Sequence, residues 1–440
     1  MELKVKMKKN IFSIIILFIS LCSISYSQNP VNINLTLNDA IKLALKNQPL
    51  IEKAEDEVKA AEAKVNEQKS FDYPDVEGNL SYNRLGPVSS IEFGGVGFLL
   101  YPANNYDADV SAKYTLYDFG KRNALFDLTK SFKLTSEEKI NLVKDQLSYN
   151  VVHLFYSILY LEKSLSVKND EINTLQQHLN VTQKKVNSGT ATDFEVLTTQ
   201  VRVASAKNEK VDIENTINKE KIALRDILGL TSDQQINLSG DFALMSQTTN
   251  ADSLLDQAFT QREEIKIAND AGNSLALQKH AVSLNDLPKL NLMGGYGIKN
   301  GFMPNLDVLR GNWVLGISAS IPIFNGFRKD AQVEEAEANL NANDAQISSL
   351  KRKIKTEVDQ SISQFKTSQA QLSTTELQVE QAKQAVKRAE ASYENGVITN
   401  LDLLDAETSL SEAELLHLRV VYQNVVNTYD LKEAVGDVIR

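Results

Sequence analysis

Two aspartates near the C-terminal end of the chain have the spacing most suggestive of chemistry. Asp402 and Asp405 lie in the run Thr399-Asn-Leu-Asp-Leu-Leu-Asp-Ala-Glu-Thr408, and residues three apart in a helix share one face. Repeated around the axis of an assembly, such a pair would form carboxylate rings, which favour cations and can close a pore. Like charges this close should raise some of their pKa values. The alternative is ordinary, because aspartate in the first turn of any helix favours the helix dipole.

Residues for catalysis or metal binding are not grouped in the sequence. No nucleophile motif or phosphate-binding loop is present, and the four histidines lack the spacing of metal ligands: His153, His178, His280 and His417. His153 and His417 lie in apolar helical stretches and are expected to be packed or to line a pore. A net charge of −10 argues against a nucleic-acid partner, which usually requires a basic face. We therefore predict no enzyme activity, no cofactor and no metal.

The first 27 residues predict a signal peptide. Lysines precede the apolar run 11–19, and Ser25-Tyr26-Ser27 has the small-x-small form of a cleavage site. The only cysteine, Cys22, follows Leu21 instead of a small residue, so acylation is not expected. The mature chain then has no cysteine and no disulfide, which for a secreted protein favours a bacterial envelope. No later apolar run reaches the ~18 residues of a membrane-spanning helix.

The remaining sequence consists of two similar halves, residues 28–240 and 241–440. Pro74 and Tyr82 recur 214 residues later, and the Gly189 turn recurs 207 residues later at Gly396. The offset changes once, by seven residues, between Tyr82 and the Leu116/Ile323 pair, so the copies differ mainly in one loop and indicate an internal duplication. Each copy has short helices, two strands, a very long helix, a small turn and a closing helix.

The predicted bounds follow from hydrophobic periodicity and from the residues that break it. In the first copy we predict short helices at 37–47 and 49–71, strands at about 75–84 and 106–116, and helices at about 121–186 and 193–229. In the second copy the short helices are at 253–261 and 263–286, the strands at about 289–299 and 312–323, and the helices at about 328–394 and 400–436. Gly189 and Gly396 can end a helix in the left-handed conformation. Thr192 and Thr399 can cap the next helix.

The strands alternate strictly and have the ~10 residues that a tilted strand needs to cross a bilayer. Trp313, Tyr106 and Tyr114 suit an aromatic girdle at the membrane interface. A soluble, half-buried sheet alternates in the same way and is the alternative. The four strands of one chain cannot close into a barrel, because the smallest membrane barrels have about eight strands. Three copies would give twelve strands, so we predict a mainly helical chain whose homotrimer closes a β-barrel.

The helices are too long for an ordinary globular domain. At about 1.5 Å per residue, the helix over 121–186 would run roughly 100 Å. A period of about 3.5 predicts a coiled-coil seam, with members Leu147, Val151, Leu154, Ile158, Leu161, Leu165, Ile172, Leu175, Leu179 and Val186. Each closing helix must pair antiparallel with its long helix, giving two hairpins that point away from the membrane.

The pattern resembles the TolC-like outer membrane efflux proteins over essentially the whole mature chain. Leu116-Tyr-Asp-Phe-Gly-Lys-Arg122 and Ile321-Pro-Ile-Phe-Asn-Gly-Phe-Arg328 resemble that family's junctions from strand to long helix. Gly189-x-x-Thr192 and Gly396-x-x-Thr399 resemble its helix-tip turns. The resemblance implies a homotrimer in the lipid of the outer membrane, with a twelve-stranded barrel continuing into a long periplasmic α-helical barrel.

The resemblance also implies a gate and partners. Asp402 and Asp405 match the family's constriction pair, and Tyr393 and Glu195 match a tyrosine and an acid that hold the aperture closed. Ile398 replaces a basic residue of the family, so one locking ion pair is expected to be absent. A periplasmic adaptor (a membrane fusion protein) would dock on the tips, and a transporter of RND, ABC or MFS type would supply energy.

The duct interpretation competes with a periplasmic adaptor or a structural coiled-coil envelope protein. An adaptor would have one central helical hairpin among compact β-domains, whereas two equal hairpins, each preceded by a strand pair, favour the duct. The exported substrate and the class of pump stay open.

Overall fold

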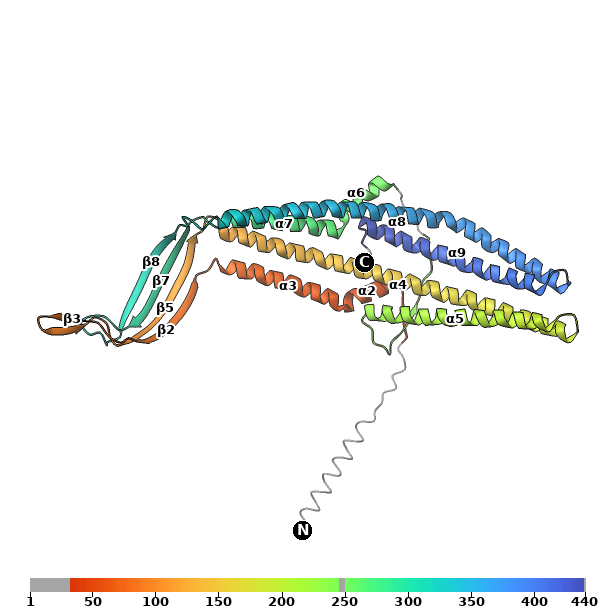
Figure 1. The fold of residues 1–440 in the computed structure, drawn as a ribbon, viewed down its shortest axis with the longest axis horizontal. Coiled ribbons are helices and arrows are strands. Elements are labelled where there is room, and N and C mark those ends of the chain that lie inside the picture. The colour runs from red at the N-terminus through yellow and green to blue at the C-terminus, as the bar shows by residue number, and fades with distance from the viewer. Residues whose placement is uncertain (1–31, 245–249, 439–440) are drawn as a thin grey trace, which may run out of the picture.

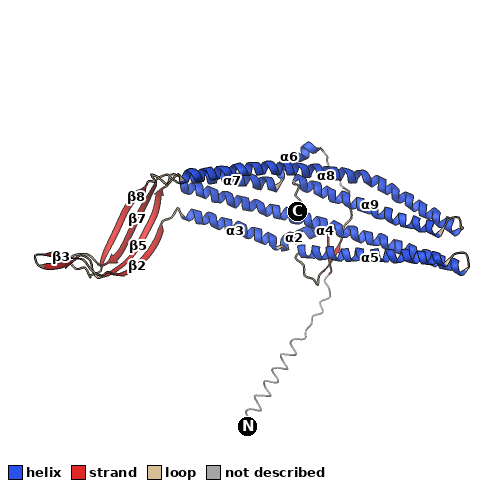
Figure 2. Ribbon diagram, in the orientation of Figure 1, coloured by secondary structure: helices blue, strands red, loops and turns tan. Residues whose placement is uncertain are grey.

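A computed structural model describes residues 32–244 and 250–438 of the chain. The predicted signal peptide at 1–27, with Cys22, lies outside the described residues. The described chain is elongated, with a twisted sheet at one end and the tips of two helical hairpins at the other (Figure 1). Helices dominate the body between these ends (Figure 2).

The order of elements in the first half is repeated in the second. The first half contains α2 (Leu37–Asn47), α3 (Pro49–Ser70), β2 (Asp75–Arg84), β5 (Asn104–Tyr117), α4 (Lys121–Asn187) and α5 (Asp193–Ile227). The second half contains α6 (Ala251–Gln261), α7 (Glu263–Ser283), β7 (Lys289–Lys299), β8 (Arg310–Ser320), α8 (Arg328–Glu394) and α9 (Asn400–Val435). The long helices α4 and α8 have 67 residues each and pack along α5 and α9 respectively.

The main sheet has the order β2-β5-β7-β8, and every neighbouring pair is antiparallel. Paired residues share a face, so Gly78, Val110, Tyr296 and Trp313 form one row across the sheet. The predicted apolar residues of all four strands therefore lie on the same face, and Glu77, Asn79, Asp109 and Ser111 belong to the opposite, mainly polar face. No other element of the described chain covers either face (Figure 1).

The predicted position of the last strand was wrong by two to three residues. β8 covers Arg310–Ser320 instead of 312–323. Pro322 lacks the N–H that a strand ladder needs, and residues 321–327 form the connection to α8. In that connection Gly326 and Phe327 have φ of +68° and +62°, as Phe119 and Gly120 have +55° and +87° before α4. Two successive left-handed residues thus turn each strand into its long helix.

Four short strands were not predicted. β3 (Ser90–Phe93) and β4 (Val96–Leu99) form a hairpin that extends from the far end of the sheet (Figure 1). β1 (Asn32–Leu35) and β6 (Gln235–Leu238) form a parallel pair beside the helices. Each has four residues, which is too short for alternation to be distinguished from chance.

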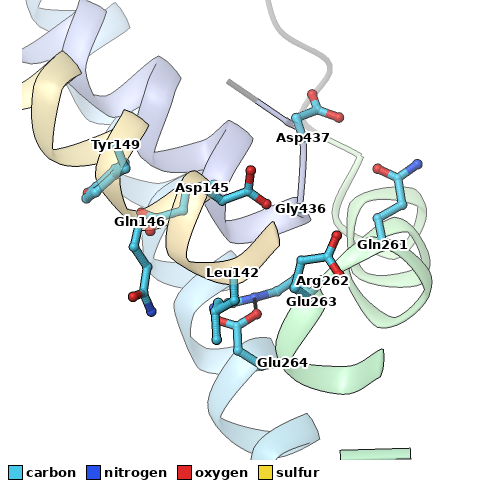
Figure 3. A pocket seen from close by; sticks show the side chains of 11 residues that line it. Leu142, Asp145, Gln146, Tyr149, Gln261, Arg262, Glu263, Glu264, Gly436 and Asp437 are labelled. Carbon is cyan, nitrogen blue, oxygen red and sulfur yellow. Dashed lines mark hydrogen bonds and ion pairs between the residues drawn. The ribbon is translucent and has the colours of Figure 1, made fainter. Parts of the chain in front are cut away.

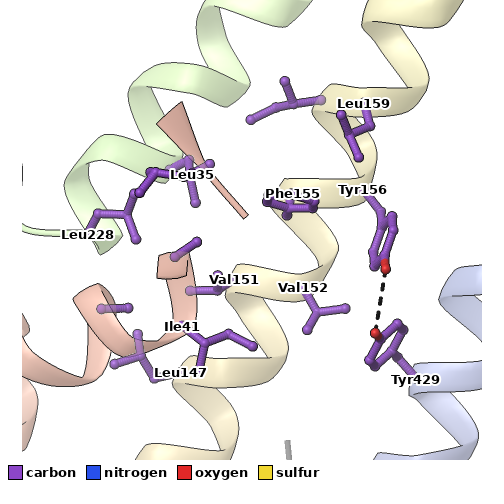
Figure 4. Packing of buried hydrophobic residues seen from close by; sticks show 14 of the residues in the cluster. Leu35, Ile41, Leu147, Val151, Val152, Phe155, Tyr156, Leu159, Leu228 and Tyr429 are labelled. Atoms are coloured by element: carbon purple, nitrogen blue, oxygen red, sulfur yellow. Dashed lines mark hydrogen bonds between the residues drawn. The ribbon is translucent and has the colours of Figure 1, made fainter. Parts of the chain in front are cut away.

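The main core lies midway along the helices, where α2, α4, α5 and the end of α9 meet. Val151 and Phe155 of α4 are fully buried in a cluster with Ile41 and Leu228 (Figure 4). Ile158 belongs to the same cluster. The buried stripe on α4 differs from the predicted seam. Val152 and Leu159 are buried although they are not members of the seam, whereas several members, such as Leu154 and Leu161, are only half-buried. A second cluster joins α6, α8 and α9 around Ile354 and Leu431.

Within residues 32–244 and 250–438, we find no helix with the combined length and apolarity of a membrane span.

Candidate gate at the helix tips

The turns at the two tips place the candidate gate residues at the end of the body opposite the sheet (Figure 1). Gly189 and Gly396 have φ of +74° and +70°, and an added Cβ at either would meet no atom within 4 Å. Glycine is therefore required there by backbone conformation and not by space. Thr192 and Thr399 follow as N-caps, each in a reciprocal capping box with the residue three positions on.

Asp402 is the second partner in one of these capping boxes. Its Oδ2 accepts hydrogen bonds from the backbone N (2.8 Å) and Oγ1 (2.6 Å) of Thr399. These bonds lower the pKa of Asp402 below its usual value. This direction is opposite to the rise expected from stacked like charges, because in the single chain Thr399 stabilises the ionised carboxylate.

Asp405 lies on the same exposed side of α9 and has a cationic partner on the other hairpin. Nη2 of Arg202, on α5, is 3.1 Å from Oδ1 of Asp405. Arg202 was not predicted, since it lies 203 positions away in the sequence and only the arrangement of the two hairpins brings it near.

Tyr393 and Glu195 also lie together. The phenolic oxygen of Tyr393, at the end of α8, is 3.5 Å from Oε2 of Glu195 on α5 and 3.4 Å from Oγ1 of Thr182. The ammonium of Lys185 lies 3.7 Å from the ring centroid and donates to the backbone oxygen of Tyr393. Burial, and then the charge of Glu195, raise the pKa of Tyr393, so its hydroxyl stays protonated and can donate.

Polar side chains behind the gate residues were missed by sequence analysis. His178 and Thr182 of α4 are buried against Asn400 and Glu407 of α9. Further along, buried Lys168 pairs with Glu171 and with Glu209 of α5, and Ser411 of α9 bonds the same Glu171. The sequence indicates these groups only through polar residues that recur at helical spacing on a helix face predicted to be buried.

A separate acidic site lies in the middle of the body, where α4 and α9 meet the junction of α6 and α7 (Figure 3). The cavity holds about 60 Å³. Arg262 and Glu264 line the cavity and bond each other, and Arg262 also bonds Glu357 of α8 outside it. Burial, and then the charge of Asp430, raise the pKa of Glu433 to about 7 against the opposing effect of Arg262.

The two histidines that were expected to be packed or to line a pore, His153 and His417, have protein partners. Nε2 of His153 lies 2.9 Å from Oδ1 of Asp430, and Nδ1 of His417 lies 3.0 Å from Oγ1 of Thr375. Across the described part of the chain, no three histidine, cysteine, aspartate or glutamate side chains converge as a metal site would require.

Two of the three aromatic residues predicted for membrane interfaces lie near opposite ends of the sheet, and the third lies between them. Tyr106 lies toward the end that carries the β3–β4 hairpin and packs against Tyr82, with ring centroids 5.1 Å apart. Trp313 lies midway along the sheet, in the row of Tyr296 and Val110. Tyr114 lies toward the helices, where it pairs with Leu292. The side chain of Trp313 is 75% exposed in the single chain.

Comparisons with known proteins identify relatives over nearly the whole described chain. A family model described as "Outer membrane efflux protein" matches residues 40–230 and 249–437. Outer membrane protein TolC of Salmonella enteritidis is 22% identical over 360 residues, which are 78% of this chain and 73% of the relative. Cation efflux system protein CusC of Escherichia coli K12 is 22% identical over 344 residues, 75% of this chain and 73% of the relative.

The fold itself is also found among solved structures. The crystal structure of CusC aligns with a TM-score of 0.79 at 20% identity, covering 91% of this chain and 92% of that one. The outer membrane protein VceC of Vibrio cholerae aligns with a TM-score of 0.79 at 21% identity, covering 92% and 97%.

Proposed function

The chain belongs to the outer membrane efflux protein family, and from that premise we propose that three copies form one duct, which exports substrates across the periplasm and the outer membrane. The observation that carries the proposal is a four-stranded sheet with one apolar and one polar face, both uncovered, joined directly to two helical hairpins. The two halves of each chain act as repeats, and each half supplies an equal part of the wall of the duct.

The edges of the sheet support closure by several copies. β2 and β8 are the edge strands and have no strand partner on their outer sides within the described residues. Since every neighbouring pair is antiparallel, β2 and β8 run in opposite directions. β8 of one copy can therefore pair antiparallel with β2 of the next. Three copies supply twelve strands, an even number within the range of membrane barrels.

The two faces of the sheet support its orientation. Leu315, Ile317 and Trp313 are largely exposed on the apolar face, which in water would be an unfavourable surface. Lipid solvates such a face, and the opposite face with Glu77, Asn79 and Asp109 then lines the lumen. Tyr106 and Tyr114, near opposite ends of β5, would then lie at the two interfaces of the bilayer.

The helices continue the lumen through the periplasm. A helix of 67 residues spans about 100 Å at 1.5 Å per residue. Two hairpins from each of three copies give twelve helices around the axis. We propose that their tips receive the periplasmic adaptor and that Asp402 and Asp405 form two stacked rings of three carboxylates there, held closed through Tyr393 and Glu195.

The energy source is an inner-membrane transporter of RND, ABC or MFS type that acts through the adaptor. Relatives carry the names "Cation efflux system protein CusC" and "Alkaline protease secretion protein AprF". Their names thus cover both an ion and a protein as cargo. We infer that the duct imposes little selectivity and that the pump selects the substrate.

Separation of the cell membranes tests the proposal. We expect the mature protein in the outer-membrane fraction, where it should resist carbonate extraction and require detergent for release. Recovery of the mature protein in the soluble periplasmic extract would contradict the proposal and would favour an adaptor or a structural coiled coil.

A further inference from the structure

A buried ionic contact joins α4 to α9 just behind the gate. The side chains of His178 and Glu407 are 3% and 4% exposed, and Nδ1 of the histidine lies 3.5 Å from Oε1 of the glutamate. Nε2 of the same histidine lies 2.7 Å from Oδ1 of Asn400, which is also buried. We call His178, Asn400 and Glu407 the His178 clamp.

The hydrogen-bonding partners select the charged form of His178. The Nδ2 of Asn400 is directed to the hydroxyls of Thr198 and Thr199, at 3.5 Å each, so its Oδ1 faces the histidine as an acceptor. The carboxylate of Glu407 is an acceptor as well. A neutral imidazole has one donor, whereas the imidazolium has two and can serve both partners.

Loss of the proton would leave an uncompensated buried charge. The second oxygen of Glu407, Oε2, is buried and has no hydrogen-bond partner among the described residues. A buried carboxylate without a cation is strongly unfavourable. Burial alone would lower the pKa of His178, but the bonds to Glu407 and Asn400 outweigh it and raise the pKa above its ordinary value.

Charged and titratable groups approach His178 from every helix around it. α9 supplies Glu407. From α4, Lys185 opposes protonation of the histidine. From α8, the ring of Tyr393 stacks on the imidazole at 5.2 Å with an interplanar angle of 27°. From α5, Glu195 reaches the hydroxyl of that tyrosine. Among the residues that the structure describes, Glu407 is the carboxylate in ion-pair range of the imidazole.

The two α9 members of the His178 clamp lie in the same two turns as the gate carboxylates. Asn400 and Glu407 are buried, whereas Asp402 and Asp405 between them are exposed on the other side of α9. Movement of this segment away from α4 would therefore displace the gate carboxylates, and the stacked Tyr393 would lose one wall of its pocket.

We propose that His178 is a positioning residue of the gate: its imidazolium, held between Asn400 and Glu407, fixes the start of α9 against α4 and favours the closed tip, and its deprotonation releases the segment toward the open state. This inference rests on the proposed function as a duct. Because the contact requires the proton, closure is favoured below the pKa of His178 and weakens as pH rises through it.

Single-channel recording in planar bilayers tests the inference, with pH varied from 6 to 8.5 on the side of the helix tips. For the purified wild-type assembly we expect the open probability to rise severalfold as pH rises through the pKa of His178. His178→Gln, which keeps a donor for one partner but does not titrate, should give a flat profile. Glu407→Gln should also be flat.

The matched control is His153→Gln. His153 also contacts a carboxylate, Asp430, but lies in the middle of the body, so this variant should keep the wild-type profile. A wild-type open probability that is constant over this range would overturn the inference, even if no variant folds. So would a His178→Gln profile equal to that of the wild type. Absence of any channel at every pH would instead contradict the proposed duct.

Discussion

Nη2 of Arg202 on α5 lies 3.1 Å from Oδ1 of Asp405 on α9, so an ion pair links the two hairpins at a candidate gate residue. In the family that the sequence resembles, a basic residue occupies the position of Ile398, and the corresponding ion pair is expected to be absent here. Arg202 supplies a cation from a different helix, and the tip can thus be held closed without a basic residue in the turn.

Replacing Arg202 with glutamine should increase the open probability modestly. The two side chains are 40% and 59% exposed, and exposed ion pairs contribute about 0.2–1 kcal/mol. We expect an increase of up to about fivefold in planar bilayers, which should shrink in high salt. Lys210→Gln is the control, because Lys210 pairs with Glu214 within α5 and links no helices. Equal effects of the two substitutions would argue against the proposed link.

Tyr393→Phe should also favour opening. It removes the hydroxyl that approaches Glu195 and Thr182 and keeps the ring that stacks on His178. Loss of such hydrogen bonds costs about 0.5–1.5 kcal/mol, so we expect a several-fold rise in open probability. Tyr156→Phe removes a similar hydroxyl contact with Tyr429 in the middle of the body. That control should leave gating unchanged, and an unchanged Tyr393→Phe channel would show that the hydroxyl does not hold the tip.

Paired replacement of Asp402 and Asp405 by asparagine should abolish block by multivalent cations from the side of the helix tips. The pKa of Asp402 is lowered below 3.8 by Thr399, so this carboxylate stays ionised and its contribution is lost only as pH falls through the lowered pKa. Block measured in single-channel currents should thus persist at pH 4.5. Its loss near pH 5.5 would mean that repulsion within the rings outweighs the bonds from Thr399.

Gly396→Ala should loosen the tip of the second hairpin. Its φ of +70° costs an L-residue about 1–2 kcal/mol. We expect faster amide hydrogen exchange at the end of α8 and the start of α9, with little change in the core around Phe155. Gly396→Asn should be milder, because asparagine tolerates this conformation better. Equal amide hydrogen exchange in the alanine and asparagine variants would show that the left-handed conformation of residue 396 does not limit the stability of the tip.

Glu433→Gln should remove part of the pH dependence of stability. The pKa of Glu433 is raised from 4.5 to about 7, so the folded chain binds more protons than the unfolded chain between these values. Its contribution to stability therefore falls as pH rises from about 4.5 to 7. The glutamine variant should have a higher Tm than the wild type at pH 8 and a similar Tm at pH 5. A lower Tm at pH 8 would contradict the assigned direction.

The long elements could be predicted from sequence because their patterns extend over many residues. α8 begins and ends at the predicted residues, and α4 ends one residue later than predicted. Alternation also predicted which residues of each strand share a face, and in the observed register the apolar residues of neighbouring strands lie on the same face. The β3–β4 hairpin was missed because four-residue strands carry too little pattern.

The contacts behind the gate could not be predicted, for a physical reason. His178 and Asn400 are 222 positions apart, and which polar residues meet depends on how two hairpins pack side by side. Periodicity indicates that a face is buried, but it does not indicate which partner satisfies each buried polar group. Tyr393 and Glu195 were named through the family resemblance alone.

Cross-linking between the sheet edges tests the pooling of strands by three copies most directly. Residues 32–440 contain no cysteine, so one cysteine can be scanned along β2 and a second along β8 in isolated outer membranes. The account predicts interchain disulfides at one register, recurring at every second residue, with products that stop at three chains. Products that extend beyond three chains, or edges that never cross-link at any register, would contradict it.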